Sequence, residues 1–315
     1  MRLTIKSFAS HTNPLITRQE GGSKMTSSFG LITTCQILFT AEEYLGRGSL
    51  NWQARTRDQL SIIRLLPEVR RIAARIPTLD SWARPTAEEL NPILQEHGFD
   101  IRLEHWKNDG LSFGVVAVSD ITVLWKAIGD AGEGIVIGGK PAFILERKTA
   151  EVKFYTSKSS LHPIVGISTQ SDDDKVFIVK MPIAPERLGF LGVISRIRSS
   201  LEPLESNWDG VQIPMVKMDA RPSMDWFRGI QAYHQHSLVA ELVQVIQQIK
   251  FAMNQHGARN MEATAGQVRS LALPDYYIVD GPFLAWLERP GIQFPLWMHH
   301  ITEESWMDPG DLSQL

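Results

Sequence analysis

Three segments in the last third of the chain constrain the fold more than any other feature. Val211–Ile230 (VQIPMVKMDARPSMDWFRGI) opens with the alternation of apolar and polar residues that is typical of a strand. Gly257–Ala265 (GARNMEATA) is rich in small residues, and Tyr277–Leu287 (YIVDGPFLAWL) is an apolar run interrupted by Gly281 and Pro282. The first segment predicts a strand, the middle one is typical of a loop or linker, and the third predicts a buried strand.

The rest of the chain predicts one α+β domain at residues 28–315, after a flexible leader at residues 1–27. Apolar residues at helical spacing precede a region rich in strand patterns, which favours α+β over a βαβ series. The predicted helices are 29–45, 58–75, a segment from Thr86, 121–128 (a short helix or a strand–helix junction), 185–201 and the start of 238–253. The predicted strands are 111–118, 142–155, 163–169, 175–181 and 211–218.

Composition excludes several classes of protein. The chain is 43% hydrophobic, which is enough to build a sizeable core, and its net charge is −3, which predicts neither a nucleic-acid partner nor a membrane partner. The single cysteine, Cys35, lies in an apolar run and is predicted to be an inert core thiol. The first residues lack the apolar stretch of a secretory signal, so the default prediction is a cytoplasmic protein, with Met1 or Met25 as its start.

No pattern predicts catalytic chemistry, a metal or a cofactor. The spacing of Gly134, Gly139 and Lys140 fits a phosphate-binding loop, but Pro141 follows where a hydroxyl residue and a helix are needed. The histidine pairs 234/236 and 299/300 lack further ligands at zinc spacing and are interpreted as surface or packing residues. If the chain is nonetheless an α+β enzyme or ligand-binding protein, its functional residues would be Lys140, His234 and His236.

Residues 208–310 resemble the C-terminal part of the serpins, the serine protease inhibitor superfamily. Asp280–Leu287 (DGPFLAWL) is similar to the family motif Asp-x-Pro-Phe-Leu-Phe-x-Ile, and Val211–Asp219 resembles a serpin strand with an internal proline. Leu242–Met253 resembles the stretch that rises into the central sheet before the reactive-centre loop. The resemblance implies a divergent, shortened serpin: N-terminal helices, a large mixed β-sheet, a smaller second sheet and an exposed loop near the C-terminus.

The resemblance also implies site residues in this loop. The hinge and loop start would be Gly257, Ala258, Ala263, Thr264 and Ala265, and the scissile bond would be Leu271–Ala272, with Arg269 and Ser270 inside the same window. Small side chains suit a hinge that must insert into a packed sheet after cleavage. In an inserted strand every second side chain points into the core. Counting from Ala258, these inward residues include Asn260 and Glu262, and a carboxylate is costly to bury there.

The resulting functional prediction is a non-enzymatic inhibitor of a serine or cysteine protease that acts as a cleaved-loop conformational trap. Its partner would be the target protease, or another protein. The alternative within the same family is a non-inhibitory binding or structural protein whose loop does not insert, as the inward Glu262 favours.

Overall fold

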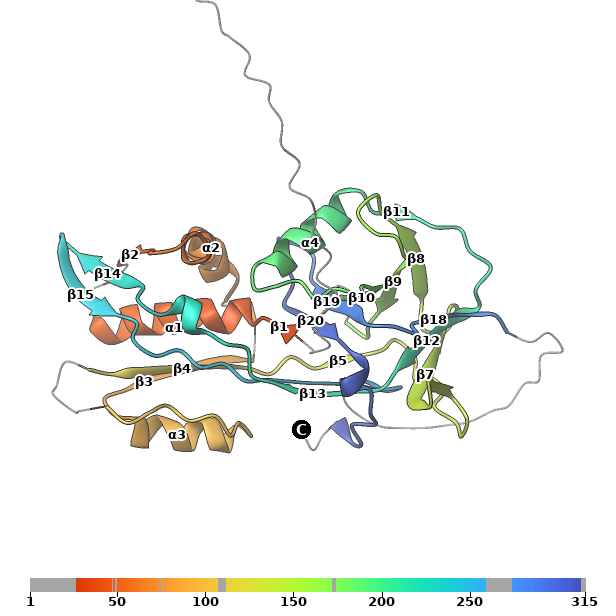
Figure 1. Ribbon diagram of the computed structural model, residues 1–315, viewed down its shortest axis with the longest axis horizontal. Coiled ribbons are helices and arrows are strands. Elements are labelled where there is room, and N and C mark those ends of the chain that lie inside the picture. Colours follow the sequence, from red (N-terminus) through yellow and green to blue (C-terminus); the bar gives the residue numbers. More distant parts are fainter. Residues whose placement is uncertain are drawn as a thin grey trace, which may run out of the picture.

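The computed structural model describes residues 27–46, 48, 50–73, 75–76, 78–106, 112–171, 174–258 and 274–312 (Figure 1). Within them the helices are α1 (Leu31–Leu45), α2 (Arg57–Ala73), α3 (Ala87–Glu96) and α4 (Gly189–Ser199), with 3-10 helices η1 (Asp225–Phe227) and η2 (Glu303–Ser305). The predictions of helices at 29–45, 58–75, from Thr86 and at 185–201 are confirmed. None of these helices combines the length and the apolar character that a membrane span requires.

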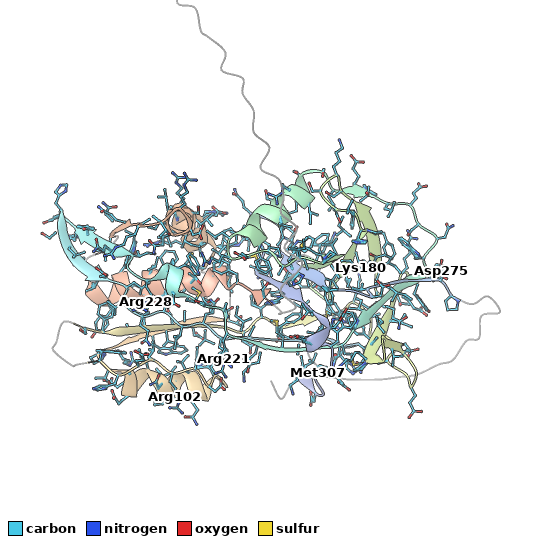
Figure 2. All side chains as sticks on the ribbon, viewed as in Figure 1. Arg102, Lys180, Arg221, Arg228, Asp275 and Met307 are labelled. Atoms are coloured by element: carbon cyan, nitrogen blue, oxygen red, sulfur yellow. The ribbon has the colours of Figure 1, made fainter. Side chains whose placement is uncertain are left out.

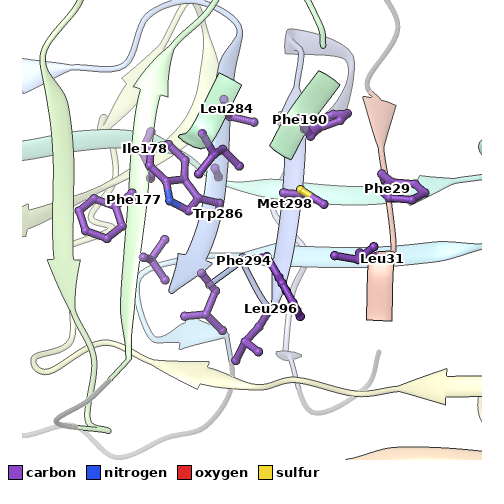
Figure 3. Packing of buried hydrophobic residues seen from close by; sticks show 14 of the residues in the cluster. Phe29, Leu31, Phe177, Ile178, Phe190, Leu284, Trp286, Phe294, Leu296 and Met298 are labelled. Atoms are coloured by element: carbon purple, nitrogen blue, oxygen red, sulfur yellow. The ribbon is translucent and has the colours of Figure 1, made fainter. Parts of the chain in front are cut away.

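The largest sheet in the described residues has seven strands, and each pair of neighbouring strands is antiparallel. Its order is β1 (Ser27–Ser28), β20 (Trp297–Ile301), β19 (Phe283–Glu288), β10 (Lys175–Lys180), β9 (Ile164–Ser168), β8 (Val152–Thr156) and β11 (Glu202–Pro203). The central strands are continuous apolar runs because both faces of the sheet are covered. Phe177 and Trp286 stack across β10 and β19 with ring centroids 5.3 Å apart, and Phe190 of α4 is buried in the same core (Figure 3).

A second sheet has four strands, β18 (Tyr276–Ile278), β12 (Gly210–Pro214), β7 (Lys140–Glu146) and β6 (Val136–Ile137). The pairing of β18 with β12 is parallel, and the other pairings are antiparallel. Gly210 is required where β12 meets β7, because a Cβ at this position would lie 2.2 Å from the backbone oxygen of Leu145. At its start, β18 is tied back to β12 by the hydrogen bond from Asp275 N–H to the Asp209 carboxylate, at 3.0 Å (Figure 2).

Two further pairs of strands lie between the helices and concern the site. The first half-sheet pairs β3 (Leu79–Arg84) with β4 (Gly114–Ser119), and the second pairs β13 (Val216–Ala220) with β16 (Ile249–Met253). Helix α1 packs on one face of the first half-sheet and α3 on the other, as Figure 1 shows. A small sheet of β2 (Asn51–Gln53), β14 (Gln231–His234) and β15 (Ser237–Glu241) lies at the end of the molecule.

Three sequence-based predictions of local structure are wrong. Residues 121–128 form no helix and contain the short strand β5 (Val123–Leu124), while 238–253 forms β15, an extended segment and β16. The predicted strand 211–218 is two strands, β12 and β13, that separate at Met215 and join different sheets. Segments 121–128 and 238–253 are rich in Val and Ile, whose branched side chains fit extended backbone better than helix.

Candidate functional site

The second half-sheet ends in a tight turn at the point where the sequence predicts the hinge. After β16, Asn254 and Gly257 form an antiparallel bridge through their backbones, with N···O distances of 3.2 and 3.3 Å. Asn254 is buried, its Nδ2 donates to the backbone oxygen of Gly310 at 3.2 Å, and its own backbone oxygen accepts from the indole N–H of Trp125 at 2.9 Å. The turn is therefore fixed to the core on two sides.

Gly257 reverses the chain so that β17 (Gly257–Ala258) pairs antiparallel with β5. Its φ of +115° lies in the region that favours glycine. A Cβ here would lie 2.6 Å from the Cα of Leu124 and 2.7 Å from the backbone nitrogen of Trp125. Both the backbone angle and the contact with β5 therefore require glycine at this position.

Replacing Gly257 with alanine is expected to lower the free energy of unfolding by about 1–3 kcal/mol, because the added methyl group meets backbone atoms that cannot rotate away. Urea unfolding measures the change. The matched control is Gly281→Ala, where a Cβ meets nothing within 4 Å, and it should leave stability unchanged. Equal effects of the two substitutions would contradict this steric account of Gly257.

Below this turn a cavity of about 1000 Å³, here called the slot, separates the two half-sheets. One wall is β4 with the residues after it, and the other wall is the segment 239–252, which includes β16. Residues of α1 form the floor. The roof is the segment 98–106, here called the strap, which follows α3.

Within the described residues, the strand edges that form the two walls of the slot have no partner strand. In the described part of the chain, β4 pairs with β3 and β16 pairs with β13, and no ladder joins β4 to β16. Unpaired strand edges are templates for another strand. The wall at residues 114–122 is about 30 Å long at about 3.3 Å per residue, so the slot has the length of a strand.

The residues of the enzyme alternative do not come together. Lys140 is exposed at the start of β7, after a turn in which Gly138 and Gly139 have positive φ. His234 and His236 lie at the tip of the β14–β15 hairpin, in a different sheet. Over the described residues there is no cluster of three or more metal-ligating side chains.

Cys35 is fully buried in α1, and burial raises the pKa of its thiol, as expected for an inert core residue.

His299 and His300 are packing residues inside β20. The ring of His299 stacks on Trp297 and also contacts Phe251, with centroids 5.2 and 4.5 Å away, and its Nδ1 lies 2.5 Å from the hydroxyl oxygen of Ser28. Burial lowers the pKa of His299 to about 3. Burial also lowers the pKa of His300, although its hydrogen bond with the backbone oxygen of Met181 opposes the shift. The sequence analysis interpreted this pair as surface or packing residues, and the structure confirms that they are packing residues.

No family model and no curated protein matches this sequence. Solved structures match over most of its length. Native protease nexin-1, determined with heparin, aligns over 87% of this chain and 98% of its own, at 12% identity and a TM-score of 0.51. A serpin from Schistosoma mansoni aligns over 86% and 98%, at 12% identity and 0.53. Uncleaved ovalbumin aligns over 89% and 94%, at 12% identity and 0.54. The chain has the serpin fold.

Within this serpin fold, only part of the predicted reactive region lies in the described residues. Gly257 and Ala258 form β17, and the chain is described again from Pro274, just before β18. The other predicted loop residues, Ala263, Thr264, Ala265, Arg269, Ser270, Leu271 and Ala272, lie outside the described residues, as do Asn260 and Glu262. Their roles stay predictions.

Sequence reasoning did not find the slot or its strap. The slot is formed by segments more than 100 residues apart, and no local pattern indicates that two strand edges will face each other unpaired. The sequence analysis named only Gly257, near one end of the slot, and did so through the resemblance to serpins.

Proposed function

We propose that this protein is a serpin-type inhibitor of a serine or cysteine protease and that it acts as a conformational trap. The protease cuts the loop near Leu271–Ala272, and the part of the loop after Gly257 then enters the slot as a new strand. The partner is the target protease.

One observation carries this proposal: the chain after β16 has already turned back, and β17 runs antiparallel to β5 next to the end of the slot. A strand that continued from β17 in the same direction would lie between the unpaired edges of β4 and β16. Filling the slot would give partners to both edges, and each new backbone hydrogen bond is worth about 0.5–1.5 kcal/mol. Insertion is therefore favourable once cleavage frees the loop.

The test compares the thermal unfolding of intact protein with that of protein cut once near Leu271, with the cut mapped by mass. We expect the cut protein to unfold at a temperature at least about 10 °C higher, since several new hydrogen bonds are gained and each kcal/mol shifts the midpoint by about 2–4 °C. A stable 1:1 complex with a protease should form with intact protein only.

The matched control is Thr264→Arg, cut at the same bond. Counting every second residue from Ala258 puts residue 264 on the inward face of the inserted strand, where a charged side chain is costly to bury, so the cut variant should show little or no rise. A single cut in the unsubstituted protein without any rise in unfolding temperature would contradict the trap.

A non-inhibitory serpin-fold binding protein is the second candidate, and the strap is the observation that favours it. The strap spans the roof of the slot and touches both walls, so it opposes their separation. For this candidate the cut protein gains no thermal stability, and no protease complex survives denaturation.

A further inference from the structure

The strap is attached to one wall of the slot by its apolar side chains. Phe99, Ile101 and Leu103 pack with α3 and β4 around a small hydrophobic cluster that is separate from the main core. The side chain of Asn91 on α3 accepts a hydrogen bond from Leu103 N–H at 2.8 Å and donates one to the Leu103 backbone oxygen at 3.1 Å. The strap, α3 and β4 are therefore one packed unit.

Polar side chains from the opposite wall hold the backbone of the strap. Oε1 of the buried Gln248 accepts hydrogen bonds from the N–H groups of Asp100 and Ile101, at 3.1 and 3.2 Å. Its Nε2 donates to both carboxylate oxygens of Asp219 on β13, at 2.7 and 2.9 Å. Arg221, labelled in Figure 2, adds an ion pair to the Asp100 carboxylate. Gln248 thus joins the strap directly to the second half-sheet.

Two more side chains of the same wall act at the ends of the strap. Gln244 accepts a hydrogen bond from Glu104 N–H at 3.1 Å, and the Lys250 ammonium donates to the Gly98 backbone oxygen at 2.6 Å. Gln244, Gln248 and Lys250 form hydrogen bonds with peptide groups of the strap and so hold its backbone. Gln248 also forms a hydrogen bond with the Asp100 carboxylate.

The neighbouring Gln247 points to the floor of the slot. Its side-chain amide accepts a hydrogen bond from Gly30 N–H at 3.3 Å and donates to the Gly30 backbone oxygen at 3.2 Å, at the start of α1. The same short segment therefore carries two glutamines that hold the roof and one that holds the floor.

We propose that the strap is a latch on the slot and that Gln248 is its main fastening. A strand placed between two others needs about 10 Å between them, twice the usual spacing of about 4.7–4.9 Å. In the described residues no ladder joins β4 to β16. At one end of the slot the two half-sheets are joined by the pairing of β5 with β17 and by the hydrogen bond from Trp125 to Asn254. Away from that end, the contacts of Gln248, Gln244, Lys250 and Arg221 with the strap join them. Releasing Gln248 lets the unit of β3, α3, strap and β4 move away from β13 and β16.

The test is hydrogen exchange of Gln248→Met, a variant that keeps the side-chain volume and removes its hydrogen bonds to the strap. The readout is the set of peptides covering β4, which Gln248 does not touch, so a faster rate reports movement of the whole unit. We expect exchange about tenfold faster in β4 and in the strap, with no change in β8, β9 and β10. The matched control, Gln247→Met, should speed exchange near Gly30 and leave β4 unchanged.

Arg221→Ala gives an independent check, because its side chain is about half exposed and its loss leaves packing intact. It should speed exchange in β4 by a smaller factor. Unchanged exchange of β4 in Gln248→Met, or equal acceleration in Gln247→Met, would overturn the latch. If Gln248→Met does not fold, the Arg221→Ala result decides: no acceleration in β4 overturns the latch.

The latch does not depend on protease inhibition, but its role in timing the loop insertion rests on the function proposed above. The two can fail separately. Faster exchange of β4 in Gln248→Met, with no gain in heat stability after cleavage, would keep the latch and reject the trap. A gain in heat stability after cleavage, with unchanged β4 exchange in Gln248→Met, would keep the trap and reject the latch.

Discussion

Replacing Asp174 with alanine should lower the free energy of unfolding by about 3–5 kcal/mol, the cost of breaking a buried ion pair from one side. The Asp174 carboxylate, buried just before β10, accepts two parallel hydrogen bonds from Arg289, at 2.7 and 2.6 Å. Arg289 follows β19, so the pair joins the ends of two central strands of the large sheet. The substitution leaves a guanidinium that is only 25% exposed without its carboxylate. Urea unfolding measures the loss.

Asp58→Ala is the control for this prediction. Asp58 pairs with Arg187 at 3.2 Å, but the two side chains are 44% and 50% exposed, so its removal should cost less than about 1 kcal/mol. Replacing both buried partners, as Asp174→Ala with Arg289→Met, should recover part of the loss because no charge is left buried. A cost for Asp174→Ala alone no larger than that for Asp58→Ala would contradict the burial argument.

Lowering the pH from 7 to 5 should remove about 2 kcal/mol of stability through His299 alone. The pKa of His299 is about 3 in the folded protein and about 6.5 in the unfolded chain, so between these values the unfolded chain holds the extra proton. The contribution is complete above pH 6.5 and is lost progressively as the pH falls toward 3. His300, whose pKa burial also lowers, acts in the same direction.

The measurement is the free energy of unfolding between pH 7.5 and 5 for the native sequence and for His299→Phe. The phenylalanine variant should show the smaller pH dependence, since its ring has no proton to gain. Equal slopes for His299→Phe and the native sequence would contradict this role of burial.

The sequence predicted those elements whose pattern is local. Of the apolar run Tyr277–Leu287, predicted as one buried strand, the second part forms β19, whose residues are apolar on both faces and are buried. The first part belongs to β18 in the other sheet, a division that the run itself does not indicate. The helix beginning after Thr86 followed from its acidic first turn and the apolar residues Leu90 and Leu94. Gly257 was named through the resemblance to serpins, and the structure adds the steric reason for a glycine there.

The sequence could not predict what depends on long-range contacts. In 238–253 the apolar residues recur at nearly helical spacing, yet the segment is extended and its glutamine side chains bond to α1 and to the strap. The sequence around Gln247 and Gln248 does not show which way each side chain points. In the structure, Gln247 bonds to Gly30 at the floor of the slot and Gln248 bonds to the strap at its roof. The slot exists only because β4 and β16 each pair with one neighbour, and pairing of that kind is decided by the whole fold.

The pairing of β1 with β20 has a consequence for the order in which the molecule is made. Ser27 and Ser28, among the first described residues, align with His300 and His299, so the edge of the large sheet joins distant parts of the chain. During synthesis on the ribosome, β1 emerges long before its partner strand β20 and stays unpaired until β20 has been made. Contacts of such high sequence separation slow folding and leave intermediates with exposed apolar surface. This edge of the sheet therefore closes only after translation has passed residue 301.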